Sequence, residues 1–214
     1  MKKQYQILLI ISFLLLLTAC NYEKDTIEKE EGVNGNNEKF NPVGTISAEI
    51  QTYAFEEAIK ESELIAELEI TEKVRELNEP SAKTIYKAKI IEGIKKDSKL
   101  TTDNLHIMQQ GNSEWIFNGN EMFQPGEKYI LFLKNAINIQ EEDTYWILGE
   151  ETGMYKKIDD KYIAKLSQKD EALADIEEKK LSDELTKTEK SSKEIQVILK
   201  EEFKEKVKKS LKRN

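Results

Sequence analysis

The sequence predicts an α+β protein in which one helix precedes a small antiparallel β-barrel or sandwich and a charged helical tail follows it. Three observations predict this class. Apolar residues recur at helical spacing early in the chain, alternate with polar residues in short segments through its middle, and return to helical spacing among dense charges at its end. Short strands at hairpin-like spacing are typical of small barrels and sandwiches. The predicted organisation is a signal over residues 1–19, a tether over 20–44, a helix-plus-barrel domain over 45–166 and a tail over 167–214.

The N-terminus has the features of an export signal. Lys2 and Lys3 precede an apolar stretch, Ile7 to Leu17, that is short for a membrane span, and polar residues follow at once. Leu17-Thr18-Ala19-Cys20 resembles the lipobox of bacterial lipoproteins. The resemblance implies transfer of a diacylglycerol group to the Cys20 sulfur, cleavage before Cys20, and anchoring by acyl chains such as palmitate on the extracytoplasmic face of the cell membrane. The alternative is an ordinary secretory signal with a chance cysteine.

The composition restricts the chemistry of the chain. Its 214 residues include 33 Lys and Arg against 41 Asp and Glu, with one cysteine and one histidine. An acidic chain without a basic domain is a poor candidate for binding the phosphate backbone of nucleic acid. One cysteine excludes an intramolecular disulfide and a cysteine-based zinc site. We therefore expect no metal, no cofactor and no nucleic-acid partner.

A helix is expected directly after the tether. Thr45 or Ser47 can cap it, apolar residues from Ile46 to Ala58 recur at helical spacing, and it would end near Ser62. The period then changes to two, which indicates strands. The predicted strands are Leu64–Ile70, Tyr86–Ile90, Leu105–Ile107, Tyr129–Leu133, Tyr145–Leu148, Met154–Ile158 and Tyr162–Leu166.

The strand at Tyr129–Leu133 differs from the others because its apolar run is uninterrupted. Such a run predicts a strand that is buried on both faces. Gln124-Pro125-Gly126-Glu127, directly before it, is typical of a type II turn, since Pro presets φ at the second position and Gly accepts positive φ at the third.

The segment Ala54 to Leu166 is similar to a recurrent extracytoplasmic domain of bacterial lipoproteins and secreted proteins. The shared pattern is a helix ending in Glu61-Ser62, an apolar strand from Leu64, a long second strand, and the strand start Pro125 to Tyr129. Lys95-Lys96-Asp97 departs from the Lys-Gly element that ends the second strand of that domain. The resemblance implies an OB-like barrel, similar in outline to netrin-like modules, and most such domains have no assigned activity.

The tail is expected to be helical. Its apolar residues recur at helical spacing, and Ser191 with Glu194 forms a plausible capping box for a last helix. That helix could dock on the barrel, lie on the membrane surface or bind a partner. The apolar positions are Ala172, Leu173, Ile176, Ile195, Leu199, Phe203, Val207 and Leu211.

No catalytic residue is predicted. His106 alternates with Leu105 and Ile107 and so points away from the core, and no nucleophile motif occurs. The aromatic-rich segment 111–123 offers a candidate ligand-binding face through Trp115, Phe117 and Phe123. These rings either fill one mouth of the barrel or form an exposed platform for a partner.

The sequence therefore predicts a lipid-anchored, non-enzymatic binding or interaction lipoprotein. Its partners would be the membrane, through Cys20, and a protein or cell-wall component. Two alternatives remain: a cell-wall hydrolase whose carboxylates cannot be identified from the sequence, and a structural or chaperone-like lipoprotein that acts through its tail.

Overall fold

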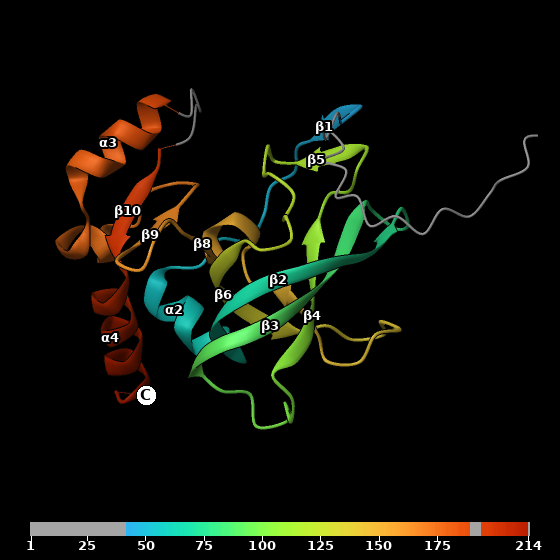
Figure 1. The fold of residues 1–214 in the computed structure, drawn as a ribbon, viewed down its shortest axis with the longest axis horizontal. Coiled ribbons are helices and arrows are strands. Elements are labelled where there is room, and N and C mark those ends of the chain that lie inside the picture. The colour runs from blue at the N-terminus through green and yellow to red at the C-terminus, as the bar shows by residue number, and fades with distance from the viewer. Residues whose placement is uncertain (1–41, 189–193, 214) are drawn as a thin grey trace, which may run out of the picture. The chain divides into compact units, whose positions relative to one another are not determined.

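Five strands close into a barrel, which confirms the expected α+β class with a small OB-like barrel (Figure 1). The strand order is β6-β2-β3-β4-β7, and β7 returns to β6. Every pair in this ring is antiparallel except β4 with β7, so the barrel is mixed. The barrel strands are β2 (Leu64–Leu77), β3 (Lys83–Lys95), β4 (Asn104–Gln110), β6 (Lys128–Asn135) and β7 (Thr144–Ile147).

The computed structural model describes residues 42–188 and 194–213, which belong to one unit, Phe40–Asn214. The predicted signal, the lipidation site Cys20, most of the tether, and Ser191 of the predicted capping box lie outside the described residues.

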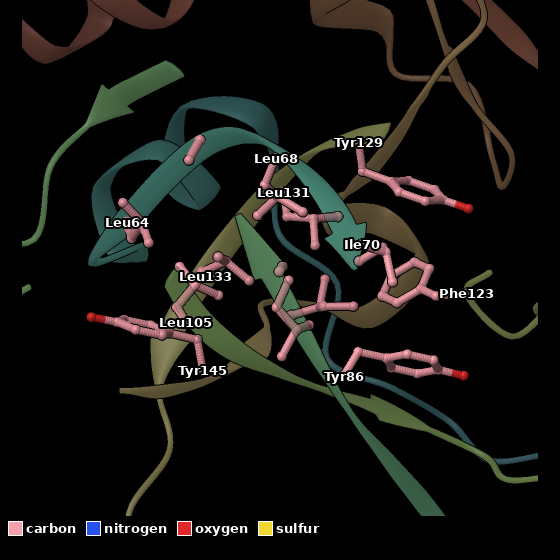
Figure 2. Close-up of a cluster of buried hydrophobic side chains, with 14 of the residues drawn as sticks. Leu64, Leu68, Ile70, Tyr86, Leu105, Phe123, Tyr129, Leu131, Leu133 and Tyr145 are labelled. Atoms are coloured by element: carbon pink, nitrogen blue, oxygen red, sulfur yellow. The ribbon is translucent and has the colours of Figure 1, made fainter. Parts of the chain in front are cut away.

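The barrel interior is filled by the inward-facing residues of each strand (Figure 2). Phe123 lies between Tyr86 and Tyr129, with ring centroids 5.5 and 4.7 Å away. Aromatic pairs at this separation add to the stability that burial of their area provides. Phe123 is 2% exposed, so it takes the inward alternative that the sequence left open.

Strand β6 is buried on both faces, as its apolar run predicts. Tyr129, Leu131 and Leu133 point into the barrel, whereas Ile130 and Phe132 belong to a second core outside it. The turn before β6 also has the predicted form, because Gly126 has φ of +90° and the Glu127 N–H donates to the Gln124 carbonyl at 3.1 Å.

The sheet continues beyond β6 through β8 (Met154–Lys157), β9 (Tyr162–Lys165) and β10 (Gln196–Leu199). β10 corrects the expectation of a wholly helical tail, because residues 196–199 pair with β9. Val197 and Ile198 are both buried although they point to opposite faces. The tail also contains the 3₁₀ helix η2 (Glu171–Ile176) and the helices α3 (Lys179–Thr188) and α4 (Lys200–Leu211).

The helix before the barrel is shorter than expected. α2 covers only Phe55–Glu61, and the residues from which we expected it to start form β1 (Gly44–Ile46). β1 pairs in parallel with β5 (Trp115–Phe117). Local periodicity carries no information about a partner that lies about seventy residues away. The sequence therefore predicted neither strand.

The last helix, α4, docks on the outside of the barrel. Phe203 and Val207 are fully buried in the second core, together with Phe55 of α2 and Phe132 of β6. None of the helices in the described parts of the chain has the length and apolar character that a membrane span requires.

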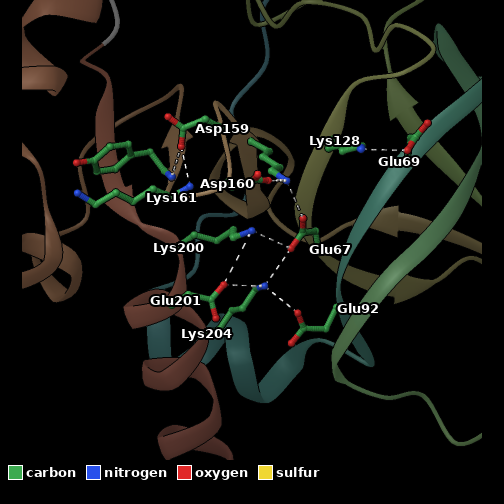
Figure 3. Close-up of polar contacts among 12 residues, drawn as sticks. Glu67, Glu69, Glu92, Lys128, Asp159, Asp160, Lys161, Lys200, Glu201 and Lys204 are labelled. Atoms are coloured by element: carbon green, nitrogen blue, oxygen red, sulfur yellow. Dashed lines mark hydrogen bonds and ion pairs between the residues drawn. The ribbon is translucent and has the colours of Figure 1, made fainter.

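Charged residues at the start of α4 reinforce this docking (Figure 3). Glu67 of β2 is buried, with the Lys204 Nζ at 3.0 Å and those of Lys200 and Lys157 at 3.7 Å. Burial alone would raise the pKa of Glu67, but the hydrogen bond from Lys204 and the three lysine charges lower it overall. Lys204 also contacts Glu92 of β3 at 2.8 Å. Each charge in this cluster has an oppositely charged partner, so the cluster stabilises the docked helix.

Candidate functional site

An open cleft of about 1260 Å³ lies on the outer face of the barrel. We call it the Trp146 cleft. Its floor is formed by outward-facing residues of β2, β4 and β7, and its walls by the β2–β3 connection near Glu79 and by loop 136–143 between β6 and β7. Ligand sites in proteins are commonly concave and mostly apolar, with a few polar groups.

The floor follows directly from strand register. Arg75 pairs with Ile85, Ile85 with Met108, Met108 with Trp146, and Trp146 with Lys134. Because paired residues share a face of the sheet, these side chains form one row across the outside of the barrel, in which Ile85 is covered and the others line the cleft. Trp146 alternates with the buried Tyr145 and Ile147 and is 41% exposed.

Loop 136–143 is held over the cleft by an ion pair. The Arg75 Nε donates to Glu141 Oε1 at 2.5 Å, and its Nη2 donates to Oε2 at 2.9 Å. This hydrogen bonding from Arg75 lowers the pKa of Glu141. A bidentate pair fixes orientation as well as distance. The loop therefore presents Ile137, which is 80% exposed, from a defined position on the wall.

The polar lining of the cleft combines five amides with seven acidic or basic side chains. The described lining contains four cationic residues and three glutamates, one of which is the buried Glu150. Arg75 is paired with Glu141, and Lys134 lies 3.8 Å from Glu61. The lining amides are Gln51, Gln110, Asn135, Asn138 and Gln140.

Glu150 is the most unusual residue of the cleft. It is 9% exposed and has φ of +45°, directly after Gly149 at +68°. A non-glycine residue in the left-handed region costs about 1 kcal/mol or more, so surrounding contacts must hold it there. Such positions are frequent at functional sites. Any other residue in place of Gly149 would clash, because a Cβ there would lie 2.3 Å from the Thr152 Oγ1.

The position of Glu150 follows from the way β4 and β7 separate. Their pairing ends at Met108 and Trp146. Beyond that point the Gln110 backbone N–H donates to the Glu150 carboxyl. Burial raises the pKa of Glu150 to about 8; the Gln110 hydrogen bond opposes this rise, the Glu151 charge adds to it and the Lys83 charge opposes it. Glu150 therefore exchanges a proton near neutral pH inside a ligand-sized cleft.

The structure places the three predicted site residues elsewhere. Trp115 and Phe117 lie on β5, where Trp115 is 38% exposed and its ring covers Gly44 of β1. Phe123 is inside the barrel. None of the three is among the described residues that line the Trp146 cleft.

Sequence reasoning missed Trp146, Ile137 and Glu150. Two signals could have found the first two: an aromatic residue between the inward-facing Tyr145 and Ile147, and an isoleucine within a polar loop. Glu150 gave no local signal, since its burial depends on β4.

His106 and the possible metal ligands remain to be placed. The Nδ1 of His106 lies 3.0 Å from the Glu142 carbonyl oxygen, and its neighbours Leu105 and Ile107 are buried, as the alternation predicts. Within residues 42–188 and 194–213, no group of three or more His, Cys, Asp or Glu side chains is arranged to hold a metal ion.

Comparison with known proteins adds no assignment. No family model matches the chain, and no curated protein matches it either. The site is therefore interpreted from its own geometry and chemistry.

Proposed function

We propose that the protein is a lipid-anchored binding module on the extracytoplasmic face of the cell membrane, and that its ligand occupies the Trp146 cleft. One observation carries this proposal: Trp146 and Ile137 are exposed within a single large cleft that is built on a closed barrel. Exposed apolar side chains that gather in a hollow are typical of interaction sites, and a rigid scaffold fixes their positions.

Binding is favoured over hydrolysis by the surroundings of the carboxylates that line the cleft. Glu63 accepts a hydrogen bond from the Asn135 backbone N–H at 2.6 Å, and Glu79 is exposed on the β2–β3 connection. Burial raises the pKa of Glu150, but the backbone bond to Glu63 and the exposure of Glu79 leave it no second carboxyl held for catalysis among the described lining. Hydrolysis of a glycosidic bond commonly uses two carboxyl groups at a defined separation, one of them with a raised pKa.

The anchoring part of the proposal rests on the sequence around Cys20. Replacement of the cysteine, Cys20→Ser, is expected to abolish incorporation of a labelled fatty acid and to leave the precursor uncleaved, because lipid transfer needs the sulfur. Metabolic labelling and the electrophoretic mobility of the protein measure both effects. Asn21→Ser, one residue later, is the matched control and should be labelled normally. Undiminished label in Cys20→Ser would rule out this anchor.

The cleft is tested in growing cells by photocrosslinking. A benzoylphenylalanine in place of Ile137 is expected to give light-dependent adducts with envelope material, since this position stands at the cleft wall. Adding Trp146→Ala should remove the adducts. The control position is Ile91 on β3, which is exposed but does not line the cleft. Equal adducts from both positions would refute a ligand site in the cleft.

A further inference from the structure

We propose that the ligand of the Trp146 cleft is an uncharged, hydroxyl-rich chain, a neutral glycan, which lies on Trp146 and is hydrogen-bonded by the surrounding amides and by Glu150. This inference rests on the proposed function and names the class of ligand. Three features of the described cleft carry it: its exposed indole, its five amides, and the ion pairs that engage Arg75 and Lys134.

The indole supplies an apolar surface of suitable shape. Trp146 projects outward from β7, between Met108 of the neighbouring strand β4 and Lys134 of β6. A sugar ring carries its C–H groups on its faces and its hydroxyls around its edge. A flat aromatic face therefore buries the C–H groups while the edge stays available for hydrogen bonds.

The amides match that edge. Each Asn or Gln side chain carries one acceptor oxygen and two donor hydrogens, and each hydroxyl both donates and accepts. Five amides from three separate parts of the chain converge on this cleft. Amides neither attract nor repel a charged ligand over long distances, so this lining favours a neutral polar partner.

The charges of the cleft argue against a polyanion. A teichoic-acid-like or nucleic-acid chain would require a row of unpaired cations. Arg75 is engaged twice by Glu141, and Lys134 faces Glu61. The Lys83 Nζ donates to the Ser81 Oγ at 2.6 Å. The Glu79 carboxylate would in addition repel phosphates.

The backbone argues against an extended peptide. A peptide that adds a strand needs N–H and C=O groups along an unpaired strand edge. At this end of the barrel the outward N–H of His106 donates to the Asp143 carbonyl at 3.0 Å, and that of Gln110 donates to Glu150. These bonds occupy the edge on which such a strand would form.

Glu150 completes the site. Its carboxyl is fixed by Gln110 from β4, faces Lys83 from β3, and has Glu151 beside it on its own element. When protonated, a carboxyl both donates and accepts, as a hydroxyl does. Because burial raises the pKa of Glu150 to about 8, the protonated form predominates at neutral pH.

The test is a titration of the mature lipoprotein in a zwitterionic detergent that carries no sugar. The probes are tetramers of β-1,4-linked N-acetylglucosamine, β-1,4-linked glucose and α-1,4-linked glucose, with polyglycerol phosphate and an extended neutral peptide for comparison. The chain has two tryptophans. In a Trp115→Phe background the fluorescence therefore reports Trp146 alone, and we expect a saturable change with at least one neutral tetramer.

Variants establish where the sugar binds. Trp146→Ala, followed by calorimetry, is expected to weaken binding at least tenfold, whereas Trp115→Ala should change it less than twofold. Gln140→Ala, at an exposed position on the cleft wall, should also weaken binding and guards against a folding defect in Trp146→Ala. Equal affinity of Trp146→Ala and the wild type would overturn the proposal.

Two further outcomes separate this inference from the proposed function. Saturation by polyglycerol phosphate or by the peptide, with none by the neutral tetramers up to about 10 mM, would overturn the glycan assignment. If the Ile137 adducts still depended on Trp146 in that case, the cleft would remain a binding site for a different ligand class. If the neutral tetramers did not bind and the Ile137 adducts did not depend on Trp146, the cleft would not be a ligand-binding site.

Discussion

Replacing Phe203 with alanine is expected to lower the free energy of unfolding by about 3–5 kcal/mol, as is usual for a fully buried aromatic residue. Phe203 is 0% exposed, and its ring centroid lies 4.6 Å from that of Tyr155, 5.6 Å from Phe55 and 6.2 Å from Phe132. Removal of the ring leaves a cavity where α2, α4, β6 and β8 meet. Urea denaturation followed by circular dichroism measures the loss.

The matched control is Lys209→Ala in the same helix. Lys209 is exposed, so its truncation should change the free energy of unfolding by no more than about 0.5 kcal/mol. If Phe203→Ala were as mild as Lys209→Ala, α4 would not be packed on the barrel in solution, and the tail would be available to the membrane or to a partner.

The sequence predicted the elements whose pattern is complete within one segment. Short apolar segments located the seven predicted strands, and the uninterrupted run at Tyr129–Leu133 correctly indicated burial on both faces. The pair Pro125-Gly126 located a turn because proline presets φ at one position and glycine accepts the positive φ that the next position requires. Each of these signals depends on residues that are neighbours in the chain.

Elements that depend on distant partners were not predictable in this way. β10 was interpreted as helix because Ile195, Leu199 and Phe203 step by four, a spacing that does not separate a helix from a short buried strand followed by one. β1 exists because β5 provides its partner. In both cases the tertiary pairing decided the conformation.

The candidate site was missed for the same reason. Arg75, Met108, Ile137, Trp146 and Glu150 belong to five separate segments, and only closure of the barrel brings them to one cleft. The sequence directed attention to segment 111–123, where aromatic residues are dense in the chain. Density along the chain is a weak guide when alternation and register determine which rings meet.

Glu150→Gln is expected to make the protein more stable than the wild type at pH 9, by on the order of 5 kcal/mol, and to leave its stability at pH 5 nearly unchanged. Burial raises the pKa of Glu150 from 4.5 to about 8. Between these values the folded protein binds more protons than the unfolded chain. The contribution of Glu150 is therefore fully present below about pH 4.5 and is lost as pH rises through about 8.

Glutamine imitates the protonated carboxyl, because it keeps an oxygen for the Gln110 N–H and does not ionise. The carboxyls whose pKa is lowered, including those of Glu67, Glu76 and Glu141, lose their stabilising effect only below about pH 4.5, outside this window. Urea denaturation at intervals from pH 5 to 9 measures the difference. Glu79→Gln, at an exposed carboxyl of the same cleft, is the control and should follow the wild type throughout. Parallel pH profiles for Glu150→Gln and the wild type would show that Glu150 is already ionised in the folded protein, and it would then face the ligand as an anion.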